Sequence, residues 1–574
     1  METLVLVIIL GVIALIIFVY GTHHNKKIRE SEIRQIRDSY GKPCIRKYDD
    51  GVYEHIPGYY NTHCHCDSDT DDGAAAQNEY FVDDITWNDL DMDDVYRSMN
   101  YTLSSAGDEY LYYMLRRLDL SDDASVSRKE ALITHYTDEP DLRFDMSMRL
   151  HDMGRTGKYS IYDYLNNLDA LDDLAPAKDY ALLAAYAVSV ALCFINRNIG
   201  IFGIIASLIY GGISYFARKR ETEAYVVSFS YIIRLLKGAV KISEAKDSFI
   251  SKESEQLDTC VRNMSGFNTM SGLVMNATTG SADLGELILD YIKMFTHIDI
   301  IKFFHMRDEV GKHRDDIDRM LTIIGLLDAC IAIGSYRTYL GTWCVPEFAE
   351  DIRYESTGLY HPLLTEPVSN DVDLKRGMLL TGSNASGKST MLRTITLASI
   401  LAQSIHTVPA ENYKAPMFRI YTSLSLSDSI LQGESYYMAE IRALKRITEA
   451  GKITATPILA AVDEVLRGTN TVERIAASTA IMRQLSKAYG LITAATHDLE
   501  LTDLLSEYYD NYHFEETITG GDIHFAYKLL PGKAMTKNAI RLLDIMGYDK
   551  MLIDEAQQMA VRYSETGRFI LQND

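Results

Sequence analysis

The amino-acid sequence predicts a multi-domain chain: an amino-terminal transmembrane helix, a mostly α-helical core that carries a transmembrane hairpin, and a carboxy-terminal α/β domain with a phosphate-binding loop. Three observations predict this architecture. An uninterrupted apolar run covers Leu4–Tyr20, and a second apolar region extends from Tyr180 to Ala217. After about residue 345, helical periodicity gives way to short apolar runs that alternate with helical stretches.

The first apolar run, 17 residues long, lies at the short end of what crosses a bilayer. Glu2 precedes it and basic residues follow it, whereas a cleaved signal peptide carries its positive charge before the apolar run. By the positive-inside rule, this asymmetry places the amino terminus outside and the following chain in the cytoplasm. We therefore expect an anchor over residues 1–24 of a multi-pass membrane protein whose carboxy-terminal domain is cytoplasmic.

The second apolar region predicts a transmembrane hairpin at about residues 180–217. Asn196-Arg197-Asn198 divides it into arms of 16 and 19 residues, and three basic residues follow it directly. Two short spans joined by a polar turn would cross the lipid bilayer and return the chain to the cytoplasmic side. The alternative is a helical hairpin buried in a soluble core.

Composition and periodicity divide the rest of the chain. Residues 25–80 are polar and contain Gly and Pro, which predicts a linker. Residues 81–345 have apolar residues at helical spacing, such as Leu111 and Leu115, and predict a helical core with the hairpin inside it. Residues 346–574 contain the runs GMLLTG, PILAAVDE and GLITAATH, whose rhythm predicts a parallel sheet covered by helices.

Charge and cysteine content limit the function. The formal net charge of -23 argues against a protein that coats nucleic acid by neutralising phosphates, although it does not exclude a local basic face. The seven cysteines are scattered, which favours reduced thiols over a disulfide framework. The one cluster, His63-Cys64-His65-Cys66, has ligand types that suit zinc or copper. No second ligand pair lies at finger spacing, so a loop without metal is the favoured interpretation.

A phosphate-binding loop is predicted between the apolar strand MLLT and the helical stretch MLRTITLASILA, the context that the pattern G-x-x-x-x-G-K-[ST] requires. The residues expected to bind nucleotide here are Gly382, Ser383, Asn384, Ala385, Ser386, Gly387, Lys388, Ser389 and Thr390. The two glycines let backbone N–H groups face phosphate oxygens. Lys388 would bridge the β- and γ-phosphates of ATP, and Ser389 would ligate Mg²⁺.

Two further strand ends supply groups that ATP hydrolysis needs. The run ILAAV ends at Asp463 and Glu464. Asp463 would hold Mg²⁺, and Glu464 would orient or deprotonate the attacking water. The run GLITAAT ends at His497, which can sense the γ-phosphate or position water. Surface acids and a structural histidine cap are the alternatives, but the order of the three motifs favours the catalytic roles.

These motifs, together with several others, resemble the MutS mismatch-repair ATPases, a branch of the ABC-type ATPases. The resemblance extends from about residue 84 to about residue 560. It includes Tyr360-His361-Pro362-Leu363-Leu364, Ser369-Asn370-Asp371, the signature segment Gly433-Glu434-Ser435-Tyr436-Tyr437-Met438-Ala439-Glu440, the stretch VDEVLRGTNTVERIA, the histidine loop ATHDLEL and a closing helical segment.

The resemblance implies a MutS-type ATPase that uses ATP and Mg²⁺ and acts as a homodimer through its ATPase domains. Asn370 would lie near the adenine, and Ser435 of one protomer would reach the γ-phosphate held by the other. Bound ATP would then hold the two domains together, and hydrolysis would release them.

The sequence departs from the family pattern at several positions. Ser383, Ala385 and Ser386 stand where the family commonly has Pro, Met and Gly, although the glycine-lysine frame is retained. Tyr436 and Tyr437 replace the usual Thr-Phe of the signature segment. We also expect the mismatch-reading domain to be absent, because only about 60 polar residues separate the first apolar run from the core.

Two functions from different classes fit these observations. The first is an ATP-driven dimeric clamp, related to mismatch repair, that contacts DNA at the membrane. Lys237, Lys241, Lys246 and Lys252 could line a DNA-binding face, although the acidic residues between them favour a solvated helix face. The second is an ATP-gated membrane scaffold or motor that acts on a membrane protein partner without binding DNA.

Overall fold

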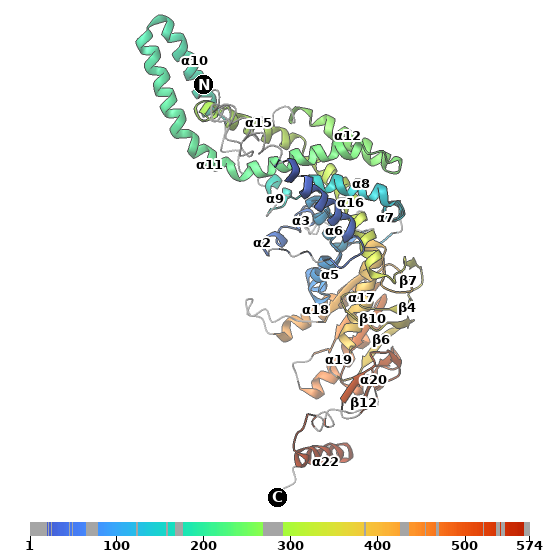
Figure 1. The fold of residues 1–574 in the computed structure, drawn as a ribbon. Helices are drawn as coiled ribbons and strands as arrows, with labels where there is room; N and C mark the ends of the chain where they lie inside the picture. Colours follow the sequence, from blue (N-terminus) through green and yellow to red (C-terminus); the bar gives the residue numbers. More distant parts are fainter. Residues whose placement is uncertain are drawn as a thin grey trace. The chain divides into compact units, whose positions relative to one another are not determined.

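A computed structural model gives the fold of residues 20–566, with gaps, as two compact units (Figure 1). We name Met1–Ser68, Arg97–Met114 and Ala124–Tyr339 the helical unit, and Asp69–Tyr96, Leu115–Asp123 and Leu340–Asp574 the sheet unit. The gaps are residues 21, 25, 45, 47, 49, 65–78, 122–123, 156–158, 167–175, 268–290, 384–385, 425–435, 454, 467–469, 520–521, 535–539, 541–542 and 544–545. Residues 1–19, nearly all of the predicted anchor, lie outside the described residues.

The helical unit confirms that the chain before about residue 345 is mostly helical. Its helices include α2 (Asp50–Tyr53), α3 (Gly58–His63), α7 (Ala124–Asp138), α8 (Pro140–Met153), α9 (Ile161–Asn166), α10 (Ala177–Ile195), α11 (Arg197–Ser243), η2 (Ser248–Ile250), α12 (Ser251–Asn263), α15 (Ile298–Lys312) and α16 (Arg314–Leu340). Helices α5 (Met92–Met99) and α6 (Ser105–Arg116) have residues in both units. Helix α16 carries much of the core, because Ile317, Leu321, Ile324 and Leu327 recur every three or four residues and are all buried.

Residues 25–80, expected to be a polar linker, are packed over part of their length. This segment contains α2 and α3, and the side chain of Tyr59 in α3 is buried. The Tyr59 hydroxyl hydrogen-bonds with Thr322 Oγ1 at 2.7 Å, and the Tyr59 N–H donates to the Glu109 carboxylate at 3.0 Å. A few aromatic and apolar side chains therefore anchor a segment whose average composition is polar, which is why composition alone misreads it.

Helices α10 and α11 form the predicted hairpin (Figure 1). Asn196 joins them, and its side chain accepts hydrogen bonds from backbone N–H groups at the start of α11. Ala177–Ile195 and Arg197–Arg220 are long and apolar enough to cross a membrane, and only 17% and 22% of their apolar windows are buried. Within the described residues the hairpin is therefore not a buried core element. Helix α11 continues to Ser243, well beyond the apolar part.

A buried polar cluster ties the base of the hairpin to α15. The Asp179 carboxylate of α10 accepts hydrogen bonds from Arg218 at 2.5 Å and from His297 Nδ1 at 2.7 Å. His297 Nε2 donates to the carbonyl of Gly211 in α11 at 2.9 Å. Because both partners of the imidazole only accept, His297 carries both ring protons. Burial lowers the pKa of His297, but the bonds to Asp179 and Gly211 outweigh it and raise the pKa above its ordinary value.

The sheet unit is built around a six-stranded sheet in the order β14-β11-β6-β10-β9-β8. Its strands are β6 (Gly377–Thr381), β8 (Arg419–Ser423), β9 (Ile458–Asp463), β10 (Gly490–Ala495), β11 (Tyr509–His513) and β14 (Leu530–Pro531). Every neighbouring pair is parallel except β11 and β14. Along the chain the strands alternate with α17 (Lys388–Ile405), α18 (Tyr436–Ala450), α19 (Thr471–Leu485) and α20 (Leu499–Leu504), and α22 (Lys550–Thr566) follows. The predicted α/β alternation is confirmed.

Shorter elements complete the sheet unit. A second sheet has the order β3-β7-β4-β5, formed by β3 (Glu347–Phe348), β7 (Asn412–Ala415), β4 (Tyr354–Leu359) and β5 (Asn370–Leu374). Two strand pairs are antiparallel: β1 (Glu79–Phe81) pairs with β2 (Arg117–Asp119), and β12 (Glu516–Thr519) pairs with β13 (Asp522–Phe525). Helix α4 (Asp84–Asp89) also belongs to this unit. The sequence does not predict β1 and β2, because strands of three residues give no readable alternation.

The register of the central strands brings the predicted motifs to one edge of the sheet. Ala495 of β10 lies opposite Leu380 of β6 on one side and Asp463 of β9 on the other. The carboxyl ends of parallel strands meet at the same edge, so the segments that follow β6, β9 and β10 converge there. Ile458, Leu459 and Val462 are buried, as expected for a strand covered on both faces.

Candidate functional site

The phosphate loop connects β6 to α17 and depends on glycine at both ends. Gly382 has φ 147° and Gly387 has φ 101°, values that other residues rarely adopt. A Cβ atom at residue 382 would lie 2.8 Å from Ser386 Oγ. Ser386 Oγ is buried and, among the described residues, has no hydrogen-bond partner, so it is available to a phosphate oxygen. Asn384 and Ala385, also expected to bind nucleotide, lie outside the described residues.

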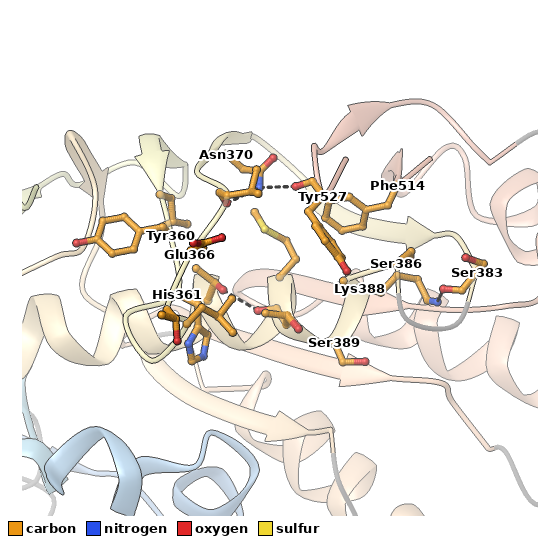
Figure 2. A pocket seen from close by; sticks show the side chains of 18 of the residues that line it. Tyr360, His361, Glu366, Asn370, Ser383, Ser386, Lys388, Ser389, Phe514 and Tyr527 are labelled. Carbon is orange, nitrogen blue, oxygen red and sulfur yellow. Dashed lines mark hydrogen bonds between the residues drawn. The ribbon is translucent and has the colours of Figure 1, made fainter. Parts of the chain in front are cut away.

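The ammonium group of Lys388 lies inside the phosphate loop. Its Nζ donates to the carbonyls of Gly382 at 2.9 Å and Ser383 at 2.8 Å, and the residue is 5% exposed. Figure 2 shows Lys388 beside Ser386, with Ser389 following on α17. A buried cation at a helix amino terminus is the electrostatic setting that binds phosphate.

The predicted magnesium ligands are in direct contact. Ser389 Oγ donates to Asp463 Oδ2 at 2.5 Å, across the 74 residues that separate them in the chain. A hydroxyl and a carboxylate, with phosphate and water oxygens to complete the shell, suit Mg²⁺. Thr390, the next residue, is exposed and lines the same pocket.

The predicted catalytic pair is also brought together. Glu464 Oε1 lies 2.8 Å from His497 Nε2, and the Glu464 N–H donates to the carbonyl of Ala495 at 3.0 Å. Both side chains line the pocket that contains the phosphate loop. A carboxylate hydrogen-bonded to an imidazole at the mouth of a phosphate site can orient a water molecule and accept its proton.

The pocket extends from the phosphate loop to the second sheet and has a volume of about 510 Å³, enough for a nucleotide. Figure 2 shows Tyr360, His361 and Asn370 across the pocket from Ser383 and Ser386. The Asn370 side chain, expected near the adenine, donates to the carbonyl of Tyr527 at 3.0 Å and accepts from the N–H of Leu529 at 2.7 Å.

Aromatic and histidine side chains line the end of the pocket away from the phosphate loop. Phe514 and Tyr527 line the pocket, and the ring of Tyr527 stacks on Phe525. Burial, together with the nearby Arg393 guanidinium, lowers the pKa of His361 to about 4, so the imidazole is neutral at physiological pH. Such a surface suits a planar base better than a second phosphate group.

Sequence reasoning missed a contact between the loop and a distant carboxylate. Ser383 Oγ donates to Glu516 Oε2 at 2.6 Å, and Glu516 is 9% exposed. The sequence gives a signal on only one side of this contact, because the resemblance described above leads to the expectation of proline where Ser383 stands. A proline has no hydroxyl, so the loop is fixed here by a bond that a proline could not make.

The remaining sequence predictions concern Ser435 and the cluster His63-Cys64-His65-Cys66. Ser435 lies outside the described residues. Of the His-Cys cluster, His65 and Cys66 also lie outside them. Both ring nitrogens of His63 are engaged, by the Tyr59 carbonyl at 2.9 Å and by Asp318 at 3.0 Å. Within the described part of the chain, no group of three or more His, Cys, Asp or Glu residues could hold a metal ion.

Comparison with known proteins agrees with this geometry. Residues 378–563 match MutS domain V. The chain is 32% identical over 269 residues to the DNA mismatch repair protein MutS of Natronomonas pharaonis, an alignment that covers 45% of this chain and 31% of the relative. The corresponding values are 30% over 266 residues, 45% and 32% for MutS of Thermus thermophilus, and 29% over 296 residues, 49% and 34% for MutS of Lactobacillus acidophilus. The chain spans about a third of the length of the curated relatives it matches.

Proposed function

Since the chain belongs to the MutS family through its carboxy-terminal domain, we propose that it binds and hydrolyses ATP and works as an ATP-driven dimeric clamp. The observation that carries this proposal is the convergence of three strand ends on one pocket. Segments spread over more than 100 residues supply the side chains of this site. Four of them line the pocket: Lys388, Ser389, Glu464 and His497. Asp463 contacts Ser389, and Glu464 contacts His497.

Each group has a distinct task in the proposed reaction. Lys388 binds the β- and γ-phosphates, while backbone N–H groups of the loop face their oxygens. Mg²⁺, held by Ser389 and by Asp463, directly or through water, would neutralise the charge that develops on the phosphates. Glu464 orients the attacking water and takes up its proton, and His497 holds the Glu464 carboxylate in place.

We propose a dimer because the ATP site of one copy would be completed by a segment from a second copy. By analogy with the family, a signature segment from a second copy would close over the γ-phosphate, with Ser435 as its contact. ATP can shift the equilibrium towards the closed dimer only if it binds the closed dimer more tightly than the open form. The test is self-association of the purified chain, measured by light scattering with and without Mg²⁺-ATP. We expect the apparent mass to double with Mg²⁺-ATP, and an unchanged mass would refute the clamp.

DNA is the proposed partner of the clamp, because the relatives are DNA mismatch repair proteins by name. A salt-dependent DNA-binding assay, with and without ATP, tests this point separately. Binding through phosphate contacts weakens steeply as salt increases. Absence of binding at every salt concentration would favour the second candidate function, an ATP-gated scaffold or motor that acts on a membrane protein partner.

The exposed apolar hairpin is the observation that favours a membrane setting, and we propose that α10 and the first half of α11 insert into the bilayer. Phe194, Phe202 and Ile213 are 88%, 75% and 73% exposed. Exposure of such apolar side chains to water is unfavourable in free energy, whereas their exposure to lipid is not. Nineteen helical residues span about 28 Å, close to the thickness of a bilayer core. Arg218, Lys219 and Arg220 then lie where anionic headgroups are found.

Tryptophan fluorescence tests insertion, because the native chain has only two tryptophans. The Phe202→Trp variant in lipid vesicles should gain fluorescence that quencher groups on the acyl chains suppress. The matched control is Met551→Trp, because Met551 lies on α22 and is 80% exposed. Equal quenching of the two variants, or none in Phe202→Trp above the native background, would place the hairpin outside the bilayer.

A further inference from the structure

The turn that carries Glu464 has an unfavourable backbone. Glu464 has φ 52° and Leu466 has φ 61°, so two residues with side chains occupy the left-handed region within three positions. Such conformations persist only where the surroundings impose them, and they are common at functional sites. The contacts that impose this turn therefore also determine where the Glu464 carboxylate lies.

One of these contacts comes from α18. The Leu466 N–H donates to Glu440 Oε1, and Glu440 is 4% exposed. The carbonyl of Val465 accepts from Ser478 Oγ of α19 at 3.0 Å. Val465 and Leu466 themselves are buried in the hydrophobic core that includes Leu444 and Ile447 of α18. The turn therefore contacts α18 in two ways: its apolar side chains pack against the helix, and its backbone N–H donates a hydrogen bond to the Glu440 carboxylate.

The position of this turn matters for the chemistry. Glu464 Oε1 lies 2.8 Å from His497, and both residues line the nucleotide pocket. A shift of the turn by about 1 Å would move the carboxylate away from the place where it meets water, and such misplacements cost about a hundredfold in rate. Glu440 itself is not among the described residues that line the pocket, so its effect on the reaction would be transmitted by the turn.

We propose that Glu440 is a positioning residue for ATP hydrolysis, which holds the turn of residues 464–466 and so sets the Glu464 carboxylate against His497. This inference rests on the proposed ATPase function. It assigns a task to the last glutamate of the signature segment, and it makes the position of α18 a determinant of the hydrolysis rate in the same protomer.

Substitutions at residue 440 test the inference in the full-length chain. Glu440→Ala removes the acceptor, and we expect kcat to fall about tenfold to hundredfold while KM for ATP stays within about threefold. Glu440→Gln keeps the length and one carbonyl acceptor, so it should restore most of kcat. Glu449→Ala is the matched control, because Glu449 lies on the same helix but is exposed and pairs with Lys452 at 2.8 Å.

The outcomes separate this inference from the proposed function. Absence of ATP hydrolysis by the unmodified chain would refute the function. Full kcat in Glu440→Ala, or a loss in Glu440→Gln as large as in Glu440→Ala, would overturn the positioning role alone. If Glu440→Ala does not fold, Glu440→Asp replaces it: its carboxylate is one methylene too short, and a reduced kcat with unchanged KM is expected, whereas a normal kcat overturns the proposal.

Discussion

Replacement of Lys388 by alanine is expected to weaken ATP binding about tenfold to hundredfold. The ammonium group lies inside the phosphate loop, where it contacts the carbonyls of Gly382 and Ser383 and is almost wholly removed from solvent. A hydrogen bond to a charged group contributes about 1.5–3 kcal/mol, which corresponds to this range of affinity. Equilibrium binding of a fluorescent ATP analogue measures the change.

A second lysine provides the control for this variant. Lys452 follows α18, is 58% exposed on its side chain, and pairs with Glu449. Lys452→Ala removes the same charge from the sheet unit without touching the pocket, so it should bind ATP like the unmodified chain. Equal ATP affinity in Lys388→Ala and Lys452→Ala would show that the loop does not hold the phosphates as proposed.

Glu464→Gln is expected to lower kcat about 10²- to 10⁴-fold while ATP affinity is retained. The amide keeps the shape of the side chain but cannot accept the proton of the attacking water, and general-base catalysis contributes rate factors of this size. Because the proposed dimer opens only after hydrolysis, the variant should also remain associated in Mg²⁺-ATP for much longer than the unmodified chain. Phosphate release and size-exclusion chromatography measure the two effects.

Glu507→Gln controls for the change of charge. Glu507 is exposed and lies just before β11, at the amino ends of the parallel strands, whereas Glu464 follows the carboxyl end of β9. This control should hydrolyse ATP at the normal rate. Normal turnover in Glu464→Gln would exclude Glu464 as the base and leave His497 as the group to test next, since it also lines the pocket.

Several elements of the site follow from sequence pattern because they depend on local geometry. A glycine-rich loop between a strand and a helix can form only a narrow set of turns, so the places of Gly382, Gly387 and Lys388 were predictable. Asp463 and His497 were predictable because Asp463 ends an apolar strand and His497 closely follows another, and the carboxyl ends of parallel strands meet at one edge.

Average composition was a poorer guide than local pattern. The polar segment 25–80 predicts a linker, but Tyr59 is buried and bonded to Thr322 and Glu109. The hairpin illustrates the limit of a local pattern. Its apolar length predicts the two helices, and the cap by Asn196 is a local contact. The hydrogen bond between Asp179 and His297, however, joins residues 118 positions apart, which no local pattern connects.

The sequence by itself determined the α/β order, the phosphate loop and the identity of the groups at the strand ends, because those features are encoded within short stretches of chain. Only the tertiary structure decided which distant groups hold them: Glu516 on Ser383, Asn370 on the backbone of Tyr527, and Glu440 on Leu466, pairs separated by 133, 157 and 26 residues. No local rule pairs such residues, because the free energy of each contact depends on burial that exists only after the sheet and its helices have packed together.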